Sequence, residues 1–368
     1  MKPELSTENL AYRRLEQQHL AGPPCPRPEE VVESLLAIQS QDFAGAKWAV
    51  AQRTLAGDDA AVQEAFQDGR ILRTHVMRPT WHFVARANIR WLLALTAPRV
   101  HAVNAYYYRK HGVDAASVKR SNARIAKALS RGTHLTREEL GREIADRDGA
   151  LTGDRLASFI MRAELDALIC SGAMRGKQHT YALLEERTSP TQALARDEAL
   201  ARLARCYVGG HGPAQALDLA WWSGVTLADA KRGLEASSGT LERAVIDEKT
   251  YWFAPTVPVK RKQALAVHLL PNYDELVIAF KDRSAMLDPG ITPITSVLSA
   301  HFVTVGGRIV GGWRRTLAKG EVVIAAQLLR KLTATERAGL EAAAARYARS
   351  LGLAFQLTCV PAPPSGPR

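Results

Sequence analysis

The order of helical and extended segments recurs three times along this 368-residue chain, and the recurrence constrains the fold more than any single motif does. In the first pass, helical spacing gives way to two short alternating segments, 71–76 and 80–85, which meet around Met77-Arg78-Pro79 and predict a hairpin. The helices expected before that hairpin cover 7–20, 29–38, 43–55 and 59–68, and another at 87–95 leads away from it. Helices followed by a two-stranded wing are the winged-helix pattern.

The second and third passes repeat this order. The second predicts helices over 115–130, 136–146 and 154–171, then a hairpin over 173–184; Thr136 with Glu139 is a capping box that marks the middle helix. The third predicts helices over 194–208, 213–222 and 227–236, then strands over 241–246 and 250–253. Because no strict sequence repeat accompanies the order, we expect tandem winged-helix units and not a solenoid.

From Val267 the character of the chain changes. We expect strands over 267–270, 276–280, 301–305, 308–313, 321–326 and 354–360, with one Ala-rich helix over 334–351. The dipeptide Gly306-Gly307 favours a tight hairpin. The predicted class is α+β and mainly helical, with three winged-helix units and a small β-rich C-terminal unit. The expected boundaries are 1–112, 113–190, 191–262 and 263–360, followed by a disordered tail at 361–368.

The charge balance suggests a polyanionic partner. Lys and Arg number 49 against 37 Asp and Glu, giving a net charge of +12, and the sequence pI is about 9.7. A generally basic proteome is the alternative explanation. The four cysteines are far apart, with no paired Cys/His spacing, so we expect no metal and no cofactor. With no apolar stretch in MKPELSTENL and no membrane-length apolar run, we expect a cytoplasmic protein.

The stretch LLAIQSQDFAGAKW, residues 35–48, carries the most suggestive polar residues. It reads as the end of an apolar helix that delivers Gln39, Gln41 and Asp42 before a second helix begins. Residues two apart diverge on a helix, so the two glutamines converge only where the helix ends or the chain is extended. An amide is no base near pH 7, but its oxygen can orient a water. The alternative is that both amides merely satisfy backbone groups at a helix end.

An ordered set of segments spread over most of the chain resembles one family. The segments are LLAIQSQDFAGAKWAVAQR, RTHVMRPTWHFV, GHGPAQALDLAWWSG, LLPNYDELVIAFKDR and GRIVGGWRR. Together they resemble the AlkZ-like winged-helix DNA glycosylases, several of which protect producers of DNA-alkylating antibiotics. The resemblance implies tandem winged helices arranged as a C-shaped clamp around duplex DNA.

The resemblance also implies the site. The family's catalytic Gln-Φ-Gln motif falls on Gln39 and Gln41, with Ser40 where a hydrophobic residue is usual. A related branch has Asp at the third position, so Gln41 places the chain with the self-resistance branch. Asp42 is a possible auxiliary carboxylate, although capping the next helix is its better-supported role.

The implied function is monofunctional hydrolysis of the N-glycosidic bond of bulky N7-alkylguanine adducts, with interstrand cross-links as a further candidate substrate. The enzyme would act as a monomer on double-stranded DNA, without a metal, cofactor or membrane. Basic or aromatic residues near turns are the expected DNA contacts, namely Arg73, Arg78, His82, Arg175, Lys177, Lys281, Arg283, Trp313, Arg314 and Arg315. Asp274 and Glu275 read as structural acids. The alternatives are a non-catalytic winged-helix DNA-binding protein and, less favoured, an RNA-binding module.

Overall fold

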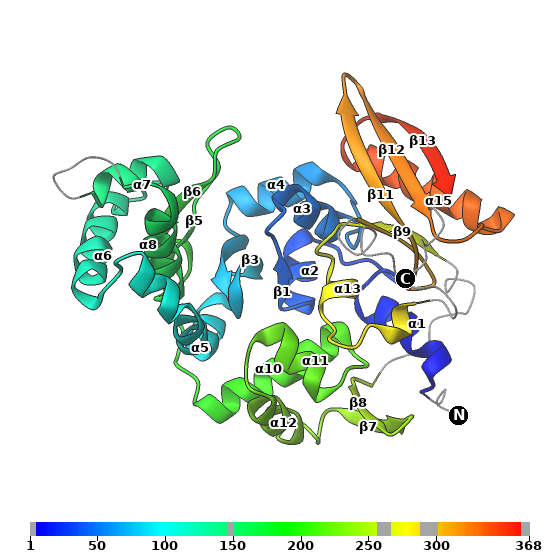
Figure 1. The fold of residues 1–368 in the computed structure, drawn as a ribbon, viewed down its shortest axis with the longest axis horizontal. Coiled ribbons are helices and arrows are strands. Elements are labelled where there is room, and N and C mark those ends of the chain that lie inside the picture. Colours follow the sequence, from blue (N-terminus) through cyan, green and yellow to red (C-terminus); the bar gives the residue numbers. More distant parts are fainter. Residues whose placement is uncertain (1–4, 146–150, 256–265, 288–300, 362–368) are drawn as a thin grey trace.

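The computed structural model describes residues 5–145, 151–255, 266–287 and 301–361. Helices and strands are both abundant, so the predicted α+β class is confirmed. In Figure 1 the helices α6 to α8 lie at one side and the C-terminal sheet at the other, with the segment that carries Gln39 between them. None of the helices described is long and apolar enough to cross a membrane.

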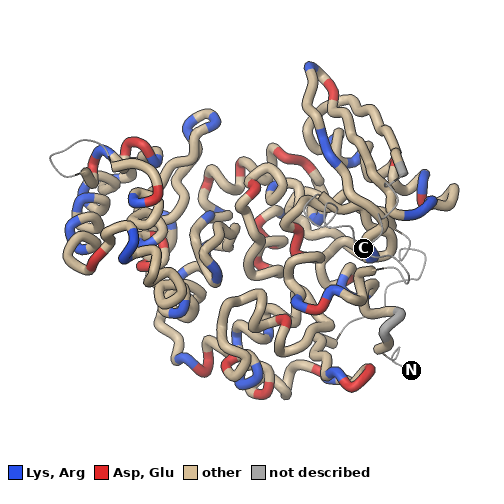
Figure 2. Tube along the Cα trace, in the orientation of Figure 1, with Lys and Arg blue, Asp and Glu red and all other residues tan. Residues whose placement is uncertain are grey.

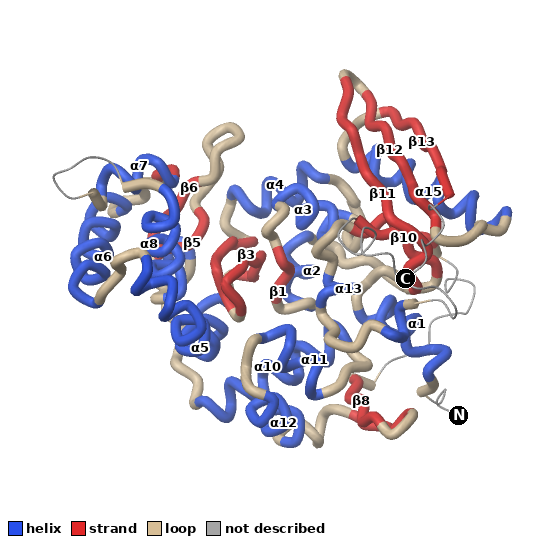
Figure 3. Tube along the Cα trace, in the orientation of Figure 1, coloured by secondary structure: helices blue, strands red, loops and turns tan. Residues whose placement is uncertain are grey.

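The first part of the chain contains four helices and a three-stranded sheet. The elements are α1 (Thr7–Gln17), α2 (Pro28–Ser34), β1 (Ala37–Gln39), α3 (Phe43–Ala51), α4 (Asp59–Gln67), β2 (Ile71–Val76) and β3 (Arg78–Ala85). The strand order is β1-β3-β2, so β1 lies on β3 and not on its sequence neighbour (Figure 3). The two strands of the predicted hairpin are therefore present, with a third strand added.

That third strand corrects the prediction of a helix over 29–38. α2 ends at Ser34, and Leu36 has the left-handed φ of 63°, which turns the chain out of the helix. Ala37, Ile38 and Gln39 then pair antiparallel with Val84, Phe83 and His82. The sequence misled because a short, fully buried apolar run fits a helix and a strand equally well, and pairing with β3 decides between them.

The second part follows a long connecting helix. Its elements are α5 (Ile89–Lys110), α6 (Ala115–Leu129), β4 (Leu135–Thr136), α7 (Arg137–Glu143), α8 (Gly153–Leu165), β5 (Ile169–Ser171), β6 (Thr180–Leu183) and α9 (Leu184–Arg187). The strand order is β4-β6-β5. The predicted capping box of Thr136 and Glu139 is confirmed. α5 extends far beyond the predicted end at 95 because Pro98 is tolerated on its exposed side.

The third part repeats helices and a hairpin. It comprises α10 (Arg196–His211), α11 (Ala216–Ser223), α12 (Leu227–Glu235), β7 (Glu242–Ile246) and β8 (Lys249–Phe253), and β7 pairs with β8 alone. The basic cluster Lys260-Arg261-Lys262 and the boundary predicted at 262 lie outside the described residues.

The C-terminal part is a five-stranded sheet backed by a helix. Its elements are β9 (Val267–Leu270), α13 (Glu275–Ile278), η2 (Ser284–Met286), β10 (His301–Val305), β11 (Arg308–Ala318), β12 (Glu321–Leu328), α15 (Ala334–Ser350) and β13 (Ala354–Pro361). The strand order is β13-β12-β11-β10-β9. Gly306 and Gly307 both have positive φ and make the predicted tight turn. Of the predicted tail, residues 362–368 lie outside the described residues.

One predicted strand of this part is a helix. Residues 276–280 alternate too little to distinguish a buried strand from a buried helical turn, and α13 takes their place. Asp274 decides the outcome, because its carboxylate accepts the backbone N–H of Leu276 and caps the helix. The result puts Glu275 on the first turn of a helix beside the glutamine motif.

The hydrophobic clusters do not follow the chain order. One cluster joins Ile38 and Phe66 of the first part to Trp313 and Tyr347 of the C-terminal part. The second part has a cluster of its own that includes Leu140 and packs α6 to α8. The glutamine segment is therefore built on the same core as the C-terminal sheet, although more than 200 residues separate them.

We expect His268 on β9 to make stability depend on pH. Burial, together with Arg346 and Arg53, lowers the pKa of His268 to about 3. Below pH ~6.5 the unfolded chain binds a proton that the folded chain excludes, so stability falls with pH from ~6.5 downward by about 1.4 kcal/mol per unit. Between pH 7.5 and 5, the wild type should lose about 2 kcal/mol more than His268→Gln, measured by urea unfolding. Equal losses in the two proteins would contradict this assignment.

Candidate active site

The motif segment leaves β1 and enters α3 within three residues. Gln39 ends the strand, the Ser40 N–H donates to the Trp81 carbonyl at 2.7 Å, and α3 begins at Phe43. Alternate residues of an extended chain share a side, which favours Gln39 and Gln41 facing one way and Ser40 the other. Gln39 is 8% exposed, Ser40 is fully buried and Gln41 is exposed. Ser40 thus occupies an interior position, and Gln41 is the more accessible amide.

Gln39 is held at its backbone and at its side chain by two different elements. Its N–H donates to Glu275 Oε1 of α13 at 2.8 Å, and its Oε1 accepts from Arg78 Nη2 of β3 at 3.1 Å. Glu275 is 1% exposed, and its other oxygen accepts from Trp222 Nε1 at 2.8 Å. A buried carboxylate therefore fixes the backbone of the first glutamine.

Ser40 is held by a second arginine. The Ser40 carbonyl accepts from Arg73 Nε at 3.2 Å and from Arg73 Nη2 at 3.0 Å. The guanidinium of Arg73 also lies over the ring of Trp81, 4.4 Å from its centroid, which adds a cation–π contact. Burial lowers the pKa of Arg73, although the side chain remains charged at neutral pH. The backbone on both sides of the Gln39–Ser40 peptide is thus bound by charged groups.

His82 faces Gln39 across the β1–β3 ladder. Its side chain is completely buried, and its Nδ1 lies 2.9 Å from the Thr80 carbonyl, so Nδ1 carries the proton. Burial, with the charge of Arg78, lowers the pKa of His82 well below its usual range. The imidazole is therefore neutral at pH 7, with a lone pair on Nε2.

Asp42 and Lys47 both have structural partners on and beside α3. The carboxylate of Asp42 accepts the Gly45 N–H at 3.0 Å and caps the helix, as predicted. A side chain at Gly45 would meet that carboxylate at 2.7 Å and the Pro271 ring at 3.1 Å, so the absence of a Cβ allows α3 to approach the loop before α13. Lys47 Nζ is paired with Asp59 at 2.6 Å and donates to Gln63.

Two predicted DNA contacts are corrected by burial. His82 is 0% and Trp313 is 1% exposed, and Trp313 Nε1 donates to the Leu270 carbonyl at 2.9 Å. Neither ring lies on the surface where the prediction required it. The sequence does not distinguish these two buried rings from exposed residues near turns, because a strand buried in the core and a strand at the surface can have the same local residue pattern.

Some of the other predicted DNA contacts are half-buried and bind other parts of the protein, and the rest are exposed. Arg73 and Arg78 are used within the motif segment, and Arg283 donates to the Val277 carbonyl at 3.0 Å. Arg315 is half-buried over the Tyr347 ring. The exposed residues are Arg175, Lys177, Lys281 and Arg314, of which Arg175 also pairs with Glu139 at 2.7 Å and donates to the His134 carbonyl. The connection between β5 and β6, which carries Arg175 and Lys177, has a basic tip in Figure 2.

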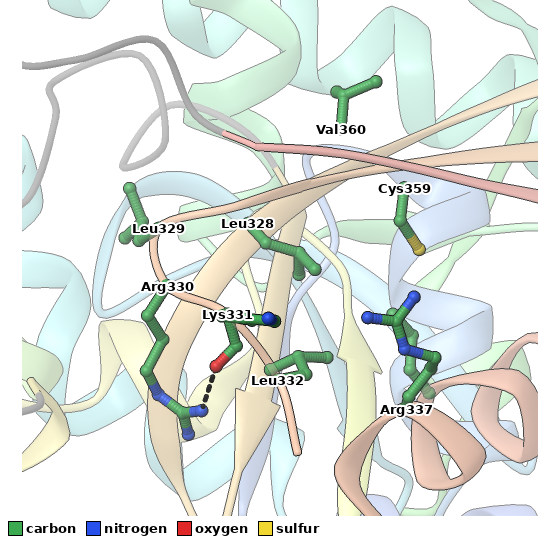
Figure 4. Close-up of a pocket in the computed structure, with 9 residues that line it drawn as sticks. Leu328, Leu329, Arg330, Lys331, Leu332, Arg337, Cys359 and Val360 are labelled. Carbon is green, nitrogen blue, oxygen red and sulfur yellow. Dashed lines mark hydrogen bonds between the residues drawn. The ribbon is translucent and has the colours of Figure 1, made fainter. Parts of the chain in front are cut away.

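One cavity lies away from the motif. It has a volume of about 390 Å³ and is lined by residues of β12, α15 and β13, among them Leu328, Arg337 and Cys359 (Figure 4). None of its lining residues belongs to the glutamine segment. The residue that sequence reasoning undervalued is Glu275, which it described only as a structural acid; no local signal places this carboxylate against Gln39.

Comparison with known proteins identifies the class. The family model described as DNA glycosylase AlkZ-like matches residues 32–350. The interstrand DNA cross-link repair glycosylase of Streptomyces sahachiroi is 25% identical over 373 residues, covering 92% of this chain and 95% of that protein. The solved structure of Streptomyces sahachiroi DNA glycosylase AlkZ has the same fold, with a TM-score of 0.74 and 21% identity, covering 97% of this chain and 100% of that one.

The family match over most of the chain, on a fold that brings the glutamine segment together with α13, defines a DNA glycosylase. The chain belongs to the AlkZ-like DNA glycosylase family.

We expect Asp42 to act through its cap and not through its charge. Asp42→Ala should lower the free energy of unfolding by about 1 kcal/mol, whereas Asp42→Ser, which keeps a capping oxygen, should lose only a few tenths. Asp58→Ala is the matched control, since Asp58 caps α4 in the same way. Urea midpoints measure the stabilities, and Asp42→Ser should excise bases at the wild-type rate. A large loss of excision in Asp42→Ser would assign the carboxylate to catalysis instead.

Proposed function

We propose that this enzyme hydrolyses the N-glycosidic bond of bulky N7-alkylguanine adducts in double-stranded DNA, including interstrand cross-links. The observation that carries the proposal is the glutamine segment, in which Glu275 holds the Gln39 backbone, Arg78 holds the Gln39 side-chain oxygen, and Gln41 is exposed. The family match and the name of the Streptomyces sahachiroi relative, an interstrand DNA cross-link repair glycosylase, support the substrate class. The non-catalytic alternative is disfavoured because the chain belongs to a glycosylase family.

The chemistry suits neutral amides. Guanine alkylated at N7 carries a positive charge, so it leaves without protonation by a strong acid. The cationic sugar that develops then needs a positioned water more than a base. An amide oxygen can accept a hydrogen bond from that water, and an amide NH2 can donate one elsewhere. The carboxylate that contacts Gln39, that of Glu275, is engaged through both oxygens, by the Gln39 N–H and by Trp222 Nε1.

The arrangement around the motif is proposed to be a clamp. Three sets of helices followed by strands, at residues 1–112, 113–190 and 191–262, would act as winged helices around the duplex, with 263–360 completing the C shape. The net charge of +12 supports a polyanionic partner. The accessible side chains of Arg175, Lys177, Lys281 and Arg314 would contact phosphates. A clamp of this kind is complete in one chain, so we propose a monomer.

The biological role we propose is protection of cytoplasmic, nucleoid DNA against a genotoxic natural product made by the same cell. Gln41 at the third motif position supports this role by resemblance to the self-resistance branch. A gene cluster for a DNA-alkylating compound beside this gene would support it. A location among general repair genes alone would argue against it.

We expect both glutamines to be required for excision but not for binding. Gln41→Ala and Gln39→Ala should slow single-turnover release of N7-alkylguanine by ~10²-fold or more, because each removes one hydrogen-bonding amide at the reacting centre. Affinity for an undamaged duplex should stay within about twofold. Gln356→Ala, which removes an exposed amide on β13, is the matched control and should react like the wild type. Wild-type rates in both motif variants would overturn the assignment.

We expect a monofunctional enzyme. Lys47, the lysine nearest the motif in sequence, is engaged by Asp59 and Gln63, which leaves its amine unsuited to forming a Schiff base. Borohydride added during turnover should therefore trap no covalent protein–DNA product, and Lys47→Arg should excise at close to the wild-type rate. A trapped product that disappears in the Lys47→Arg variant would contradict this expectation.

A further inference from the structure

Arg78 determines whether the oxygen or the NH2 group of the Gln39 side chain faces the Arg78 guanidinium. A guanidinium has only donors, so the Gln39 atom that lies 3.1 Å from Arg78 Nη2 must be the carbonyl oxygen. The opposite orientation of the amide would set two donors against each other. The NH2 group of Gln39 therefore points away from Arg78.

Arg78 is itself held by the charges around it. The negative charge of Glu275 attracts it, while Arg283 repels it and burial lowers its pKa. Glu275 cannot turn, because its two oxygens accept from the Gln39 N–H and from Trp222 Nε1, and His211 Nε2 lies 3.7 Å from the carboxylate. The negative charge that attracts the Arg78 guanidinium is therefore held in place, on the carboxylate that also binds the Gln39 backbone N–H.

His82 on β3 is compatible with this orientation. Its proton is on Nδ1, directed at the Thr80 carbonyl, and its Nε2 has no hydrogen-bond partner among the residues described. A bare imidazole nitrogen offers only an acceptor, so it cannot compete with Arg78 for the oxygen of Gln39.

Gln41 differs from Gln39 in every one of these respects. It is exposed, and within the described part of the chain its side chain has no hydrogen-bond partner. Its amide can present either end. The two residues of the motif are therefore not equivalent in what they can offer a substrate.

We propose that Arg78 is a positioning residue that makes Gln39 the hydrogen-bond donor of the pair and leaves Gln41 as the acceptor that orients water. The inference rests on the proposed function. In the reaction, the C1′–N9 bond breaks with its electron pair passing to N9, and the cationic base leaves as neutral N7-alkylguanine. The water oxygen bonds to C1′ and its proton passes to bulk water. The NH2 of Gln39 donates to an acceptor atom of the damaged nucleotide, and the carbonyl of Gln41 accepts from the attacking water.

The first test uses Arg78→Met, Arg78→Lys and Gln39→Ala in single-turnover excision of an N7-methylguanine duplex, at saturating enzyme. Arg78→Met should slow the rate constant ~10- to 100-fold with the dissociation constant within about twofold, and Arg78→Lys, which keeps a donor, should recover much of the loss. The double variant Arg78→Met/Gln39→Ala should be no slower than Gln39→Ala, because Arg78 acts through Gln39.

The opposite outcome is equally specific. If Arg78 is only a phosphate contact, Arg78→Met weakens binding, reduces the salt dependence of binding by about one charge and leaves the saturated rate constant unchanged. That result, or additive losses in the double variant, overturns the proposal. A wild-type rate in Gln39→Ala overturns the proposed catalytic role of the motif itself, so the two failures are distinguishable.

The second test does not need Arg78 to be replaced. Gln39→Glu keeps an oxygen for Arg78 but presents a second oxygen where the NH2 stood, so at pH 7.5 it should be as slow as Gln39→Ala. Gln41→Glu keeps an acceptor and should lie within about tenfold of the wild type. Urea midpoints establish that each variant is folded. Full activity in Gln39→Glu, or a loss in Gln41→Glu as large as in Gln39→Glu, overturns the division of roles.

Discussion

The hydrogen bond from the Gln39 N–H to Glu275 joins two parts of the chain that are 236 residues apart, and the geometry of the site depends on it. Its neighbour Asp274 forms a bidentate pair with Arg53, at 2.7 and 2.8 Å, in which both side chains are completely buried. Removing one member of such a pair leaves an uncompensated buried charge, which typically costs about 3–5 kcal/mol. The Arg53–Asp274 pair therefore fixes the position of α13. Glu275, the next residue on that helix, in turn holds the backbone of Gln39 through its hydrogen bond.

This anchoring explains why a loop that follows a three-residue strand can hold a reacting group. Polar contacts reach the Gln39–Ser40 peptide from α13, from β2 and from β3. The elements that supply them are packed in the same cores as the C-terminal sheet and α10. Enzymes that rely on orientation need this kind of rigidity, because a displacement of about 1 Å costs roughly 10²-fold in rate.

Much of this architecture was predictable from local patterns, and the errors have a common cause. Strands 71–76, 267–270 and 301–305 were predicted at their observed bounds, because alternation and turn residues marked them. Three wrong elements, β1 at 37–39, β5 at 169–171 and α13 at 275–278, are short buried runs whose type is set by their packing and pairing partners. Trp313 was misplaced for the same reason. The glutamine pair was visible in sequence, whereas the roles of Arg78 and Glu275 depend on a tertiary contact that no local pattern carries.

The balance of charge around Gln39 accounts for a neutral residue at this position. Arg78 and Glu275 attract each other beside it, and the buried His82 is neutral, so the two charged side chains that hydrogen-bond Gln39 itself carry one positive and one negative charge. Gln39 is only 8% exposed. An ionised side chain at this position would add a charge with no partner of its own, and removing that charge from water is costly. An amide avoids that cost and still offers a directed donor. Because an N7-alkylated guanine already carries the positive charge that makes it a leaving group, its excision gains little from a strong acid in the enzyme. The protein's contribution is then the direction in which a single amide points.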